Sequence, residues 1–357
     1  MHLFSIIGLM SGTSLDGVDL SFCTYSHTSS KWNYTIKATK FYPYTVNWHQ
    51  KLKNATQLTA IELYQLDIEI AHLFAGYIKE FIKEFSIDLS NINAIASHGH
   101  TIYHQPEKGF TVQIGNGETL AALTNLIVIN DFRSKDVALG GQGAPLVPIG
   151  DHYLFSDYAD GFLNIGGITN ICCIVNNNIS AFDICPGNIP LNYITQHIGL
   201  SYDKNGDLAR QGTTSENLLI KLNSLKYYTR VSPKSLGIEW FEKDFFPLLT
   251  KSSLSTEDLL STIVEHIAFQ VSSVANNLSI KQLFITGGGA YNTYLIEQLE
   301  SYFNGKIILP ENDVIEFKEA IIFGFLGACR LALHNNCLSS VTGSIRNSCG
   351  GVIHIPN

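Results

Sequence analysis

Charged residues are scarce in this 357-residue chain: they make up 15% of it, and the formal net charge is −8. A globular protein usually carries about 25% charged residues. Disordered chains combine low hydrophobicity with high net charge, and a hydrophobic content of 45% excludes that class. The acidic balance argues against nucleic acid or an anionic membrane as the main partner, because polyanions are bound through Lys and Arg.

Several familiar patterns are also missing. The seven cysteines form no C-x-x-C pair, which favours free thiols in a reducing compartment over a zinc ribbon. No apolar run approaches the roughly 20 residues of a membrane helix, and the N-terminus lacks the basic segment of a signal peptide. Neither a P-loop nor the H-R-D loop of protein kinases occurs. We therefore expect a soluble, cytoplasmic protein.

Short β-type apolar runs that end in glycine clusters alternate with helical patterns, which indicates an α/β protein. The helices expected most strongly are 61–85 and 255–277. The length suggests roughly two domains. A Gly- and Pro-rich stretch over 130–148 places the boundary just before it, which gives domains over 1–128 and 129–336, with 337–357 completing the first.

Two apolar stretches over 4–10 and 18–24 flank Ser-Gly-Thr-Ser-Leu-Asp-Gly, and Asp16-Gly17 is a strong hairpin signal. We expect an antiparallel hairpin whose turn forms an anion-binding nest of backbone amides, with Thr13 and Ser14 as hydroxyl donors. Asp16 and Asp19 could hold hydrated Mg²⁺ against phosphate oxygens. The alternative is an ordinary turn with polar surface residues.

Two further glycine segments follow predicted strands, at 164–170 and 286–292. Either could receive phosphate, and either could be a plain turn. The second resembles the start of a dinucleotide fingerprint, but Asn292 occupies the place of the third glycine. Three such clusters at strand ends suggest a nucleotide cleft.

Asp183 follows an apolar run and precedes a Pro-Gly turn, so it is a candidate general base or, equally, the cap of a helix. The neighbouring Cys185 is interpreted as a buried thiol, not a nucleophile. His98 and His100 would share one face of a strand, as in some metal hydrolases, although hydrogen bonding in a loop is the commoner use. Arg133 could clamp a substrate carboxylate or pair with a nearby Asp.

In order along the chain, several motifs resemble those of the anhydro-N-acetylmuramic acid kinase family. They are Gly8-Leu-Met-Ser-Gly-Thr-Ser-Leu-Asp-Gly-Val-Asp19, Ser97-His-Gly, Val112-Gln-Ile-Gly-Asn116, Asp131-Phe-Arg133, Gly140-Gly-Gln-Gly-Ala-Pro-Leu-Val-Pro148, Asn164-Ile-Gly-Gly167, Pro186-Gly-Asn188 and Gly287-Gly-Gly-Ala290. The resemblance covers nearly the whole chain. It implies a two-domain actin-like ATPase fold of ribonuclease H-like units, with ATP in the interdomain cleft.

The resemblance also implies the reaction. The 1,6-anhydro bond of the amino sugar is opened by water while O6 receives the γ-phosphoryl group of ATP, giving N-acetylmuramic acid 6-phosphate and ADP in cell-wall recycling. Asp183 would be the base, assisted by Glu319, and Mg²⁺ would be held by Asp16 through water. ATP would be bound by Gly12, Thr13, Ser14, Leu15, Asp16, Gly17, Val18, Asp19, Gly166, Gly167, Gly287, Gly288 and Gly289. The sugar would be bound by His98, Arg133, Gln142 and Asn188, with Arg133 near the lactyl carboxylate. A homodimer is the assembly that the family suggests.

Three positions depart from the family pattern. Cys185 replaces the glycine of Asp-x-Gly-Pro-Gly-Asn, Asn192 stands where Asp is usual, and His100 stands where Gln is common. The first two flank the predicted base. A related sugar or small-metabolite kinase, or a nucleotide-binding pseudoenzyme, is therefore the alternative to the leading hypothesis.

Overall fold

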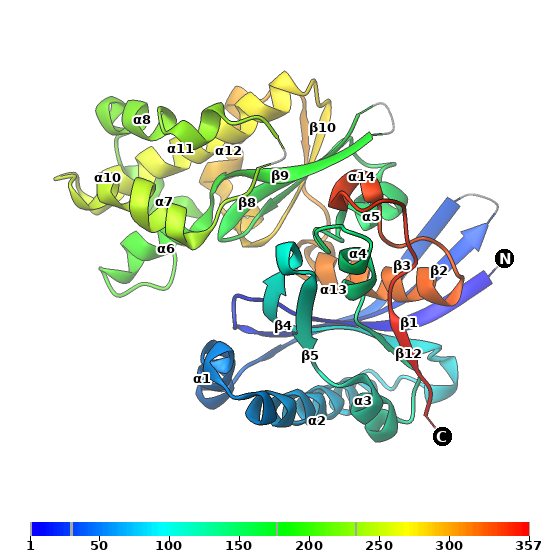
Figure 1. Ribbon diagram of the computed structural model, residues 1–357. Coiled ribbons are helices and arrows are strands. Elements are labelled where there is room, and N and C mark those ends of the chain that lie inside the picture. Colours follow the sequence, from blue (N-terminus) through cyan, green and yellow to red (C-terminus); the bar gives the residue numbers. More distant parts are fainter. Residues whose placement is uncertain (1, 29–30, 176–177, 233, 357) are drawn as a thin grey trace. The chain divides into compact units, whose positions relative to one another are not determined.

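The computed structural model describes residues 2–28, 31–175, 178–232 and 234–356 (Figure 1). The chain divides into two compact units, one formed by Met1–Leu154 with Phe317–Asn357 and the other by Phe155–Glu316. The first unit thus includes residues 129–154 and 317–336, which the sequence interpretation assigned to the second domain. They belong there because β6 (Val128–Asn130) pairs with β4 (Ala94–Gln105), and because the helix that begins at Asn312 packs on the first sheet.

The secondary structure of each unit alternates between strands and helices. The first unit contains β1 (His2–Ser11), β2 (Gly17–Thr28), β3 (Lys31–Pro43), α1 (Val46–Lys53), α2 (Ala60–Glu84), β4, β5 (Phe110–Ile114), α3 (Gly117–Thr124), β6, α4 (Ser134–Ala138), α5 (Pro148–Gly150), most of α13 (Asn312–Leu331), α14 (Ser339–Thr342) and β12 (Val352–His354). The second contains β7 (Gly161–Ile165), β8 (Ile168–Val175), β9 (Asn178–Pro186), α6 (Asn188–Gln196), α7 (Asp207–Gln211), α8 (Glu216–Asn223), α9 (Ile238–Trp240), α10 (Phe246–Thr250), α11 (Thr256–Asn277), β10 (Gln282–Thr286), α12 (Thr293–Tyr302) and β11 (Lys306–Ile308).

The two sheets repeat one topology. In the first unit β1, β2 and β3 form an antiparallel meander, while β4 is parallel to β1 and β6 is parallel to β4. In the second, β7, β8 and β9 form the meander, with β10 parallel to β7 and β11 parallel to β10. This five-strand order is that of a ribonuclease H-like unit. The predicted α/β fold class with two such units is confirmed.

Local sequence explains the long helices. Thr59 and Glu62 form a capping box at the start of α2, and the Ser255 side chain accepts from the Asp258 N–H at the start of α11. Both helices bury an apolar face in the core of their own unit. The predicted helices over 61–85 and 255–277 are therefore confirmed within one residue at each end.

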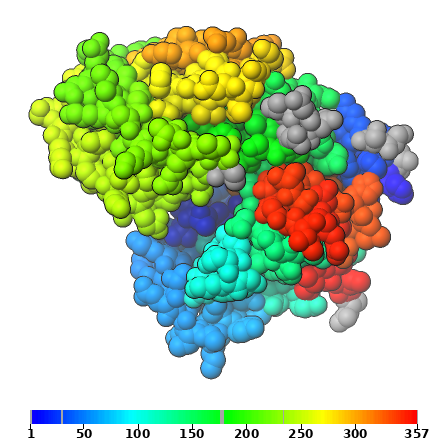
Figure 2. All heavy atoms as spheres, turned by 45° about the horizontal axis from the view of Figure 1, so that its top comes forward, coloured from blue at the N-terminus to red at the C-terminus, as the bar shows by residue number. Residues whose placement is uncertain are grey.

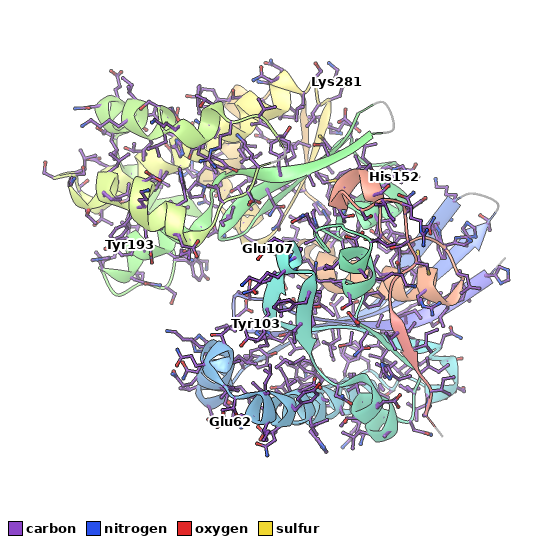
Figure 3. All side chains as sticks on the ribbon, viewed as in Figure 1. Glu62, Tyr103, Glu107, His152, Tyr193 and Lys281 are labelled. Atoms are coloured by element: carbon purple, nitrogen blue, oxygen red, sulfur yellow. The ribbon has the colours of Figure 1, made fainter. Side chains whose placement is uncertain are left out.

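The opening hairpin is also confirmed, with Met10 opposite Asp19 at its closed end. On the neighbouring strand, Tyr103 of β4 donates from Oη to the Thr56 carbonyl at 3.1 Å, which ties the sheet to the turn that precedes α2 (Figure 3). The contact holds β4, an interior strand of the first sheet, against the turn before α2.

Helix α13 lies directly against β1. A Cβ at Gly8 would overlap the carbonyl oxygen of Ala320, so only glycine permits this approach. The buried Tyr25 hydroxyl donates to the Ile321 carbonyl at 2.5 Å. A buried ion pair of 2.6 Å joins Lys318 to Asp151. The start of the first-unit part of α13 is therefore held in one position.

The C-terminal segment, red in Figure 2, lies on the surface of the first unit against the loop that follows α4. The N–H of Gln142 in that loop donates to the Thr342 carbonyl at 2.8 Å. Among the described residues, no helix is long and apolar enough to span a bilayer.

Candidate active site

The loop between β1 and β2 presents Thr13, Ser14 and Asp16 at the surface of the first unit. Asp16 Oδ1 accepts from the Ser14 hydroxyl at 2.6 Å and from the Gly17 N–H at 3.0 Å. Its second oxygen, Oδ2, accepts no hydrogen bond from the part of the chain that the structure describes. An exposed carboxylate oxygen of this kind fits the hard oxygen ligation of Mg²⁺.

Three other residues predicted to bind ATP, Leu15, Val18 and Asp19, also contribute to the structure of the hairpin. Leu15 takes a left-handed backbone with φ of 60°, and the side chain of Val18 is fully buried in the core. Asp19 lies within β2 and is half-buried. Val18 as a whole has no exposed surface and pairs with Tyr42 of β3, so its part in ATP binding stays a prediction.

The glycines of the three predicted phosphate segments divide into two groups by what a Cβ would meet. At Gly17, Gly287 and Gly289 a Cβ would overlap neighbouring protein atoms, and at Gly167 it would lie 3.1 Å from Ile189. At Gly12, Gly166 and Gly288 the nearest atoms would be 3.5, 3.5 and 3.6 Å away, which is ordinary contact, and none of the three has a left-handed φ. The folded protein itself does not require glycine at those three positions. Close approach of a ligand to the backbone is a reason for the glycines there.

His98, on β4, contacts Arg133 just before α4. The guanidinium of Arg133 donates to His98 Nε2 from Nε at 3.2 Å and from Nη2 at 3.0 Å, and Nη1 donates to the Gly143 carbonyl at 2.7 Å. Because a guanidinium only donates, Nε2 is the unprotonated nitrogen, and Nδ1–H donates to the Gly99 carbonyl at 2.9 Å. Burial, together with the charge of Arg133, holds the pKa of His98 well below its ordinary value. His98 is therefore neutral, and three of the five N–H groups of Arg133 are occupied.

Of the two alternatives that the sequence left for Arg133, pairing with a nearby Asp is wrong. Asp131 accepts from the Ser134 N–H, and the buried Asp136 accepts from the Gly143 N–H and the Thr342 hydroxyl. Within the described residues, two N–H groups of Arg133 therefore remain for a ligand.

Another buried chain of hydrogen bonds ends at the phosphate loop. Ser11, the last residue of β1, contacts the Tyr44 hydroxyl at 2.6 Å and His100 Nδ1 at 2.8 Å through its own hydroxyl. Burial lowers the pKa of His100 to about 4. His100 is therefore a neutral residue that fixes the start of the loop.

Glu319 lies on α13, within the electrostatic reach of Arg133. The Glu319 residue has exposed surface, but the protein around its carboxyl desolvates it, and this raises its pKa. The positive charges of Arg133 and Lys318 act in the opposite direction and lower it. The structure thus brings Glu319, His98 and Arg133 into one region of the first unit, and Gln142 is exposed on the neighbouring loop.

In the second unit, Asp183 lies on β9 and not at a helix start. The cap of α6 is Gly187, so the alternative interpretation of Asp183 as a helix cap is wrong. Asp183 Oδ2 accepts from the Leu236 N–H at 2.8 Å, and the Tyr227 hydroxyl donates to the Asp183 carbonyl at 2.7 Å. Burial raises the pKa of Asp183, opposed by the Leu236 N–H. A carboxylate with a raised proton affinity is suited to act as a base.

Asn188 lies beside the two glycine segments of the second unit. Its N–H donates to the Gly166 carbonyl at 2.8 Å, and its side chain donates to the Ile165 carbonyl at 3.3 Å. A Cβ at Gly288 would lie 3.6 Å from Asn188 Nδ2. The structure therefore groups Asn188 with the glycines predicted to bind ATP.

The model of the anhydro-N-acetylmuramic acid kinase family matches residues 4–356. The chain belongs to this family. Relatives of that name include one from Sulfurimonas denitrificans, 35% identical over 98% of both chains, and one from Nitrosomonas europaea, 33% identical over 98% of this chain and 99% of its own. A solved structure of an "Activator of the 2-Hydroxyisocaproyl-CoA Dehydratase" from Clostridium difficile shares 12% identity over 92% of this chain and 97% of its own, with a TM-score of 0.47, too low to add to the argument.

The departures from the family pattern have ordinary environments here. Cys185 is fully buried, and burial raises the pKa of its thiol to about 12, so it stays protonated and unreactive at neutral pH. The carbonyl of Asn192, on α6, accepts from the Thr195 hydroxyl at 3.1 Å.

Within the described ranges, no group of three or more His, Cys, Asp or Glu side chains is arranged to hold a metal ion. The metal-hydrolase alternative needs the lone pair on His98 Nε2 as a metal ligand. That lone pair accepts hydrogen bonds from the guanidinium of Arg133 instead. Both histidines serve hydrogen bonding, as the commoner of the two interpretations expected, but they do so within the strand β4 and not in a loop.

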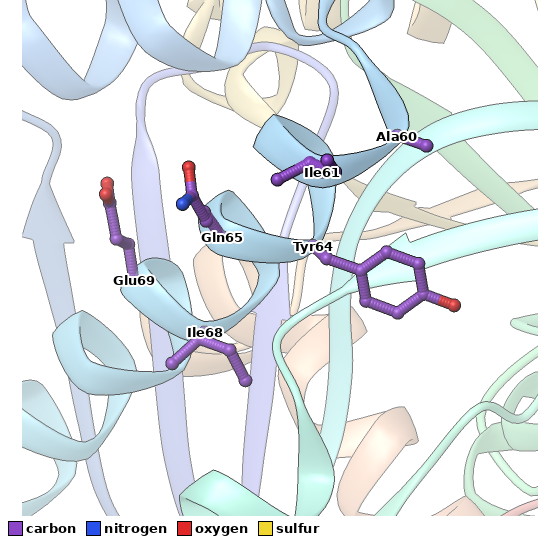
Figure 4. A pocket seen from close by; sticks show the side chains of 6 residues that line it. All are labelled: Ala60, Ile61, Tyr64, Gln65, Ile68 and Glu69. Carbon is purple, nitrogen blue, oxygen red and sulfur yellow. The ribbon is translucent and has the colours of Figure 1, made fainter.

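A groove elsewhere on the first unit runs along the first turns of α2 (Figure 4). All of its lining residues come from that helix, and they are Ala60, Ile61, Tyr64, Gln65, Ile68 and Glu69. None of them belongs to the predicted site.

Sequence reasoning missed the stretches 226–232 and 234–236, from which Tyr227, Lys234 and Leu236 hydrogen-bond to Asp183. One signal could have found them, because the region is rich in Lys and Arg within an acidic chain. Nothing in the local pattern indicated that it lies beside β9.

Proposed function

We propose that this chain is an ATP-dependent kinase that opens 1,6-anhydro-N-acetylmuramic acid with water and phosphorylates O6, giving N-acetylmuramic acid 6-phosphate and ADP in cell-wall recycling. The family match over residues 4–356 supports the reaction. The mechanism rests on one observation at Asp183. A hydrogen bond from the Leu236 N–H holds one oxygen of its carboxylate, and burial raises its pKa.

Asp183 acts as the base for the attacking water. Oδ2 is held by the Leu236 N–H, which leaves Oδ1 to take the proton as the water oxygen bonds to the anomeric carbon. The bond from that carbon to O6 breaks, and O6 attacks the γ-phosphorus of ATP. The bond from that phosphorus to the β,γ-bridging oxygen then breaks, and ADP leaves. Glu319, whose pKa is also raised, assists in proton transfer.

Backbone amides at Gly12–Gly17, with the hydroxyls of Thr13 and Ser14, bind phosphate oxygens of ATP. Gly166, Gly167 and Gly287–Gly289 bind the nucleotide from the second unit, where Asn188 contacts the same segments. Mg²⁺ fits the open oxygen of Asp16, reached through water, and it neutralises charge on the phosphates when it is bound.

The sugar is bound by His98, Arg133 and Gln142 of the first unit. His98 orients the guanidinium, so that the two free N–H groups of Arg133 point to sugar oxygens.

The reaction takes place in the cytoplasm, where ATP is available. The protein functions as a homodimer, which light scattering would test.

The experiment is product identification by mass spectrometry after incubation with ATP, Mg²⁺ and the anhydro sugar in ¹⁸O-water. We expect a phosphorylated product that carries ¹⁸O at the anomeric position. Asp183→Asn should abolish turnover while ATP binding, measured by calorimetry, persists. Normal turnover of that variant would remove Asp183 from its role, and the absence of any product from the unaltered protein would overturn the proposed reaction.

A further inference from the structure

An unusual concentration of positive charge lies in the second unit, along α8 and the segment that joins it to α9. Residues 217–238 contain Lys221, Lys226, Arg230 and Lys234 and no Asp or Glu, in a chain whose formal net charge is −8. Like charges so close together repel one another, which costs free energy unless an anion is bound.

The segment is built onto the candidate base. The Asp183 N–H donates to the Lys234 carbonyl at 3.1 Å, in addition to the bonds that Asp183 makes with Tyr227 and Leu236. Lys234 therefore lies alongside Asp183, and its backbone is held by the same strand that positions the base.

Buried hydrogen bonds among Tyr228, His266 and Asn223 attach this segment to α11. Tyr228 contacts His266 Nε2 of α11 at 2.8 Å through its hydroxyl, and His266 Nδ1 lies 2.7 Å from Asn223 Oδ1. Because the Asn223 oxygen only accepts, Nδ1 carries the proton and Tyr228 donates to Nε2. Burial lowers the pKa of His266 to about 3, so this arrangement holds throughout the physiological range. The segment is thus preorganised for binding.

Two of the four cations converge on one aromatic ring. Lys234 Nζ lies 4.7 Å from the centre of the Tyr227 ring, and Arg230 Cζ lies 5.8 Å from it. Among the described residues, neither forms an ion pair with a carboxylate. Lys234 is half-buried, and its pKa is lowered by burial and by the charge of Arg230. A desolvated ammonium without an anionic partner is an open anion site.

We propose that Lys234, with Arg230, binds the lactyl carboxylate of the sugar substrate. The inference rests on the proposed function. Asp183 acts at the anomeric carbon. The two cations lie at the ring of Tyr227, whose hydroxyl donates to the Asp183 carbonyl, so we expect them within reach of the same sugar. Arg133 is the competing candidate for this carboxylate, but three of its five N–H groups are already engaged by His98 and Gly143. The ammonium of Lys234, by contrast, forms no ion pair with a carboxylate of the described residues.

The test compares two anhydro sugars, one with and one without the lactyl carboxylate. 1,6-Anhydro-N-acetylmuramic acid carries the lactyl carboxylate, and 1,6-anhydro-N-acetylglucosamine lacks it. Lys234→Met should raise KM for the first sugar by about 10- to 100-fold, the loss typical of a charge-assisted hydrogen bond, and should leave KM for ATP unchanged. On the second sugar the variant and the unaltered protein should be alike.

Lys226→Met is the matched control, because Lys226 is an exposed cation of the same segment. Within the described residues its ammonium forms no cation–π contact with the Tyr227 ring, and the hydrogen bonds of Asp183 come from other residues. It should change neither KM. Equal losses on both sugars, or no loss on either, in the Lys234 variant would overturn the proposal. Loss of discrimination in Arg133→Met alone would assign the carboxylate to Arg133. Activity of the unaltered protein on the anhydro sugar tests the proposed function separately.

Discussion

Arg133 holds His98 in a single tautomer and is in turn aimed by it. Two guanidinium nitrogens donate to His98 Nε2, at 3.0 and 3.2 Å, and His98 is buried. The pair joins the middle of the first sheet to the segment just before α4, so the direction of the guanidinium depends on the strand.

Replacing His98 tests this relationship. His98→Leu removes the acceptor and frees the guanidinium, and we expect KM for the sugar to rise about 10-fold while KM for ATP is unchanged. His98→Gln retains a side-chain acceptor and should recover part of the loss. Steady-state kinetics on both variants measure the effect, with thermal unfolding to verify that each is folded. An unaltered KM in the Leu variant would show that Arg133 needs no such support.

Glycine substitutions separate ligand binding from folding. Gly12→Ala meets only ordinary contacts, so we expect the free energy of unfolding to change by less than about 0.5 kcal/mol while KM for ATP rises. Gly8→Ala is the structural counterpart, since its Cβ would overlap Ala320, and it should lower stability by at least about 1 kcal/mol. Urea unfolding and ATP kinetics distinguish the two. A Gly12 variant with an unchanged KM for ATP would argue against close phosphate approach at that position.

The raised pKa of Asp183 has opposite consequences for activity and for stability. Only the ionised carboxylate can accept a proton, so kcat should fall as the pH is lowered through the folded-state pKa, at a pH above the ordinary Asp value of about 3.9. A group whose pKa is raised by folding stabilises the protein below its unfolded-state pKa, and that stability is lost as the pH rises through the folded-state pKa. At neutral pH the ionised Asp183 therefore costs stability.

Asp183→Asn should consequently unfold at a higher temperature than the unaltered protein at pH 7, by about 2 °C, and the difference should vanish near pH 3. Differential scanning calorimetry at the two pH values measures it. A variant less stable at pH 7 would mean that the bond from the Leu236 N–H outweighs desolvation.

The buried ion pair of Lys318 and Asp151 predicts strong coupling between these residues. Lys318→Met leaves a buried carboxylate without its cation and should cost about 3–5 kcal/mol in the free energy of unfolding. Lys318→Met combined with Asp151→Asn removes both charges and should recover a large part of that loss. Urea unfolding of the two variants gives the comparison. Equal destabilisation in both would show that the pairing contributes little.

Periodicity and capping chemistry determined the local structure. The apolar stretches over 4–10 and 18–24 around Asp16-Gly17 indicated the hairpin, and the spacing of apolar residues indicated the two long helices. These features depend on neighbours along the chain, which a sequence displays directly. The ordered glycine motifs named the family for the same reason.

The environments of the candidate residues depended on tertiary structure. The sequence placed Asp183 equally well at a helix cap, and only the pairing of β8 with β9 put it within a strand. Nothing near Arg133 in sequence indicated His98 as its partner. Lys234 gains its place beside Asp183 because the segment after α8 folds back onto β9.

The sequence by itself determined which chemical groups this protein carries, their local secondary structure and the family to which they belong. Tertiary structure decided which groups are buried, which are already occupied by hydrogen bonds and which remain open. The physical reason is that hydrogen bonding and desolvation arise between segments far apart in the chain, and they set the proton affinity of Asp183 and leave Lys234 without an anionic partner within the described residues.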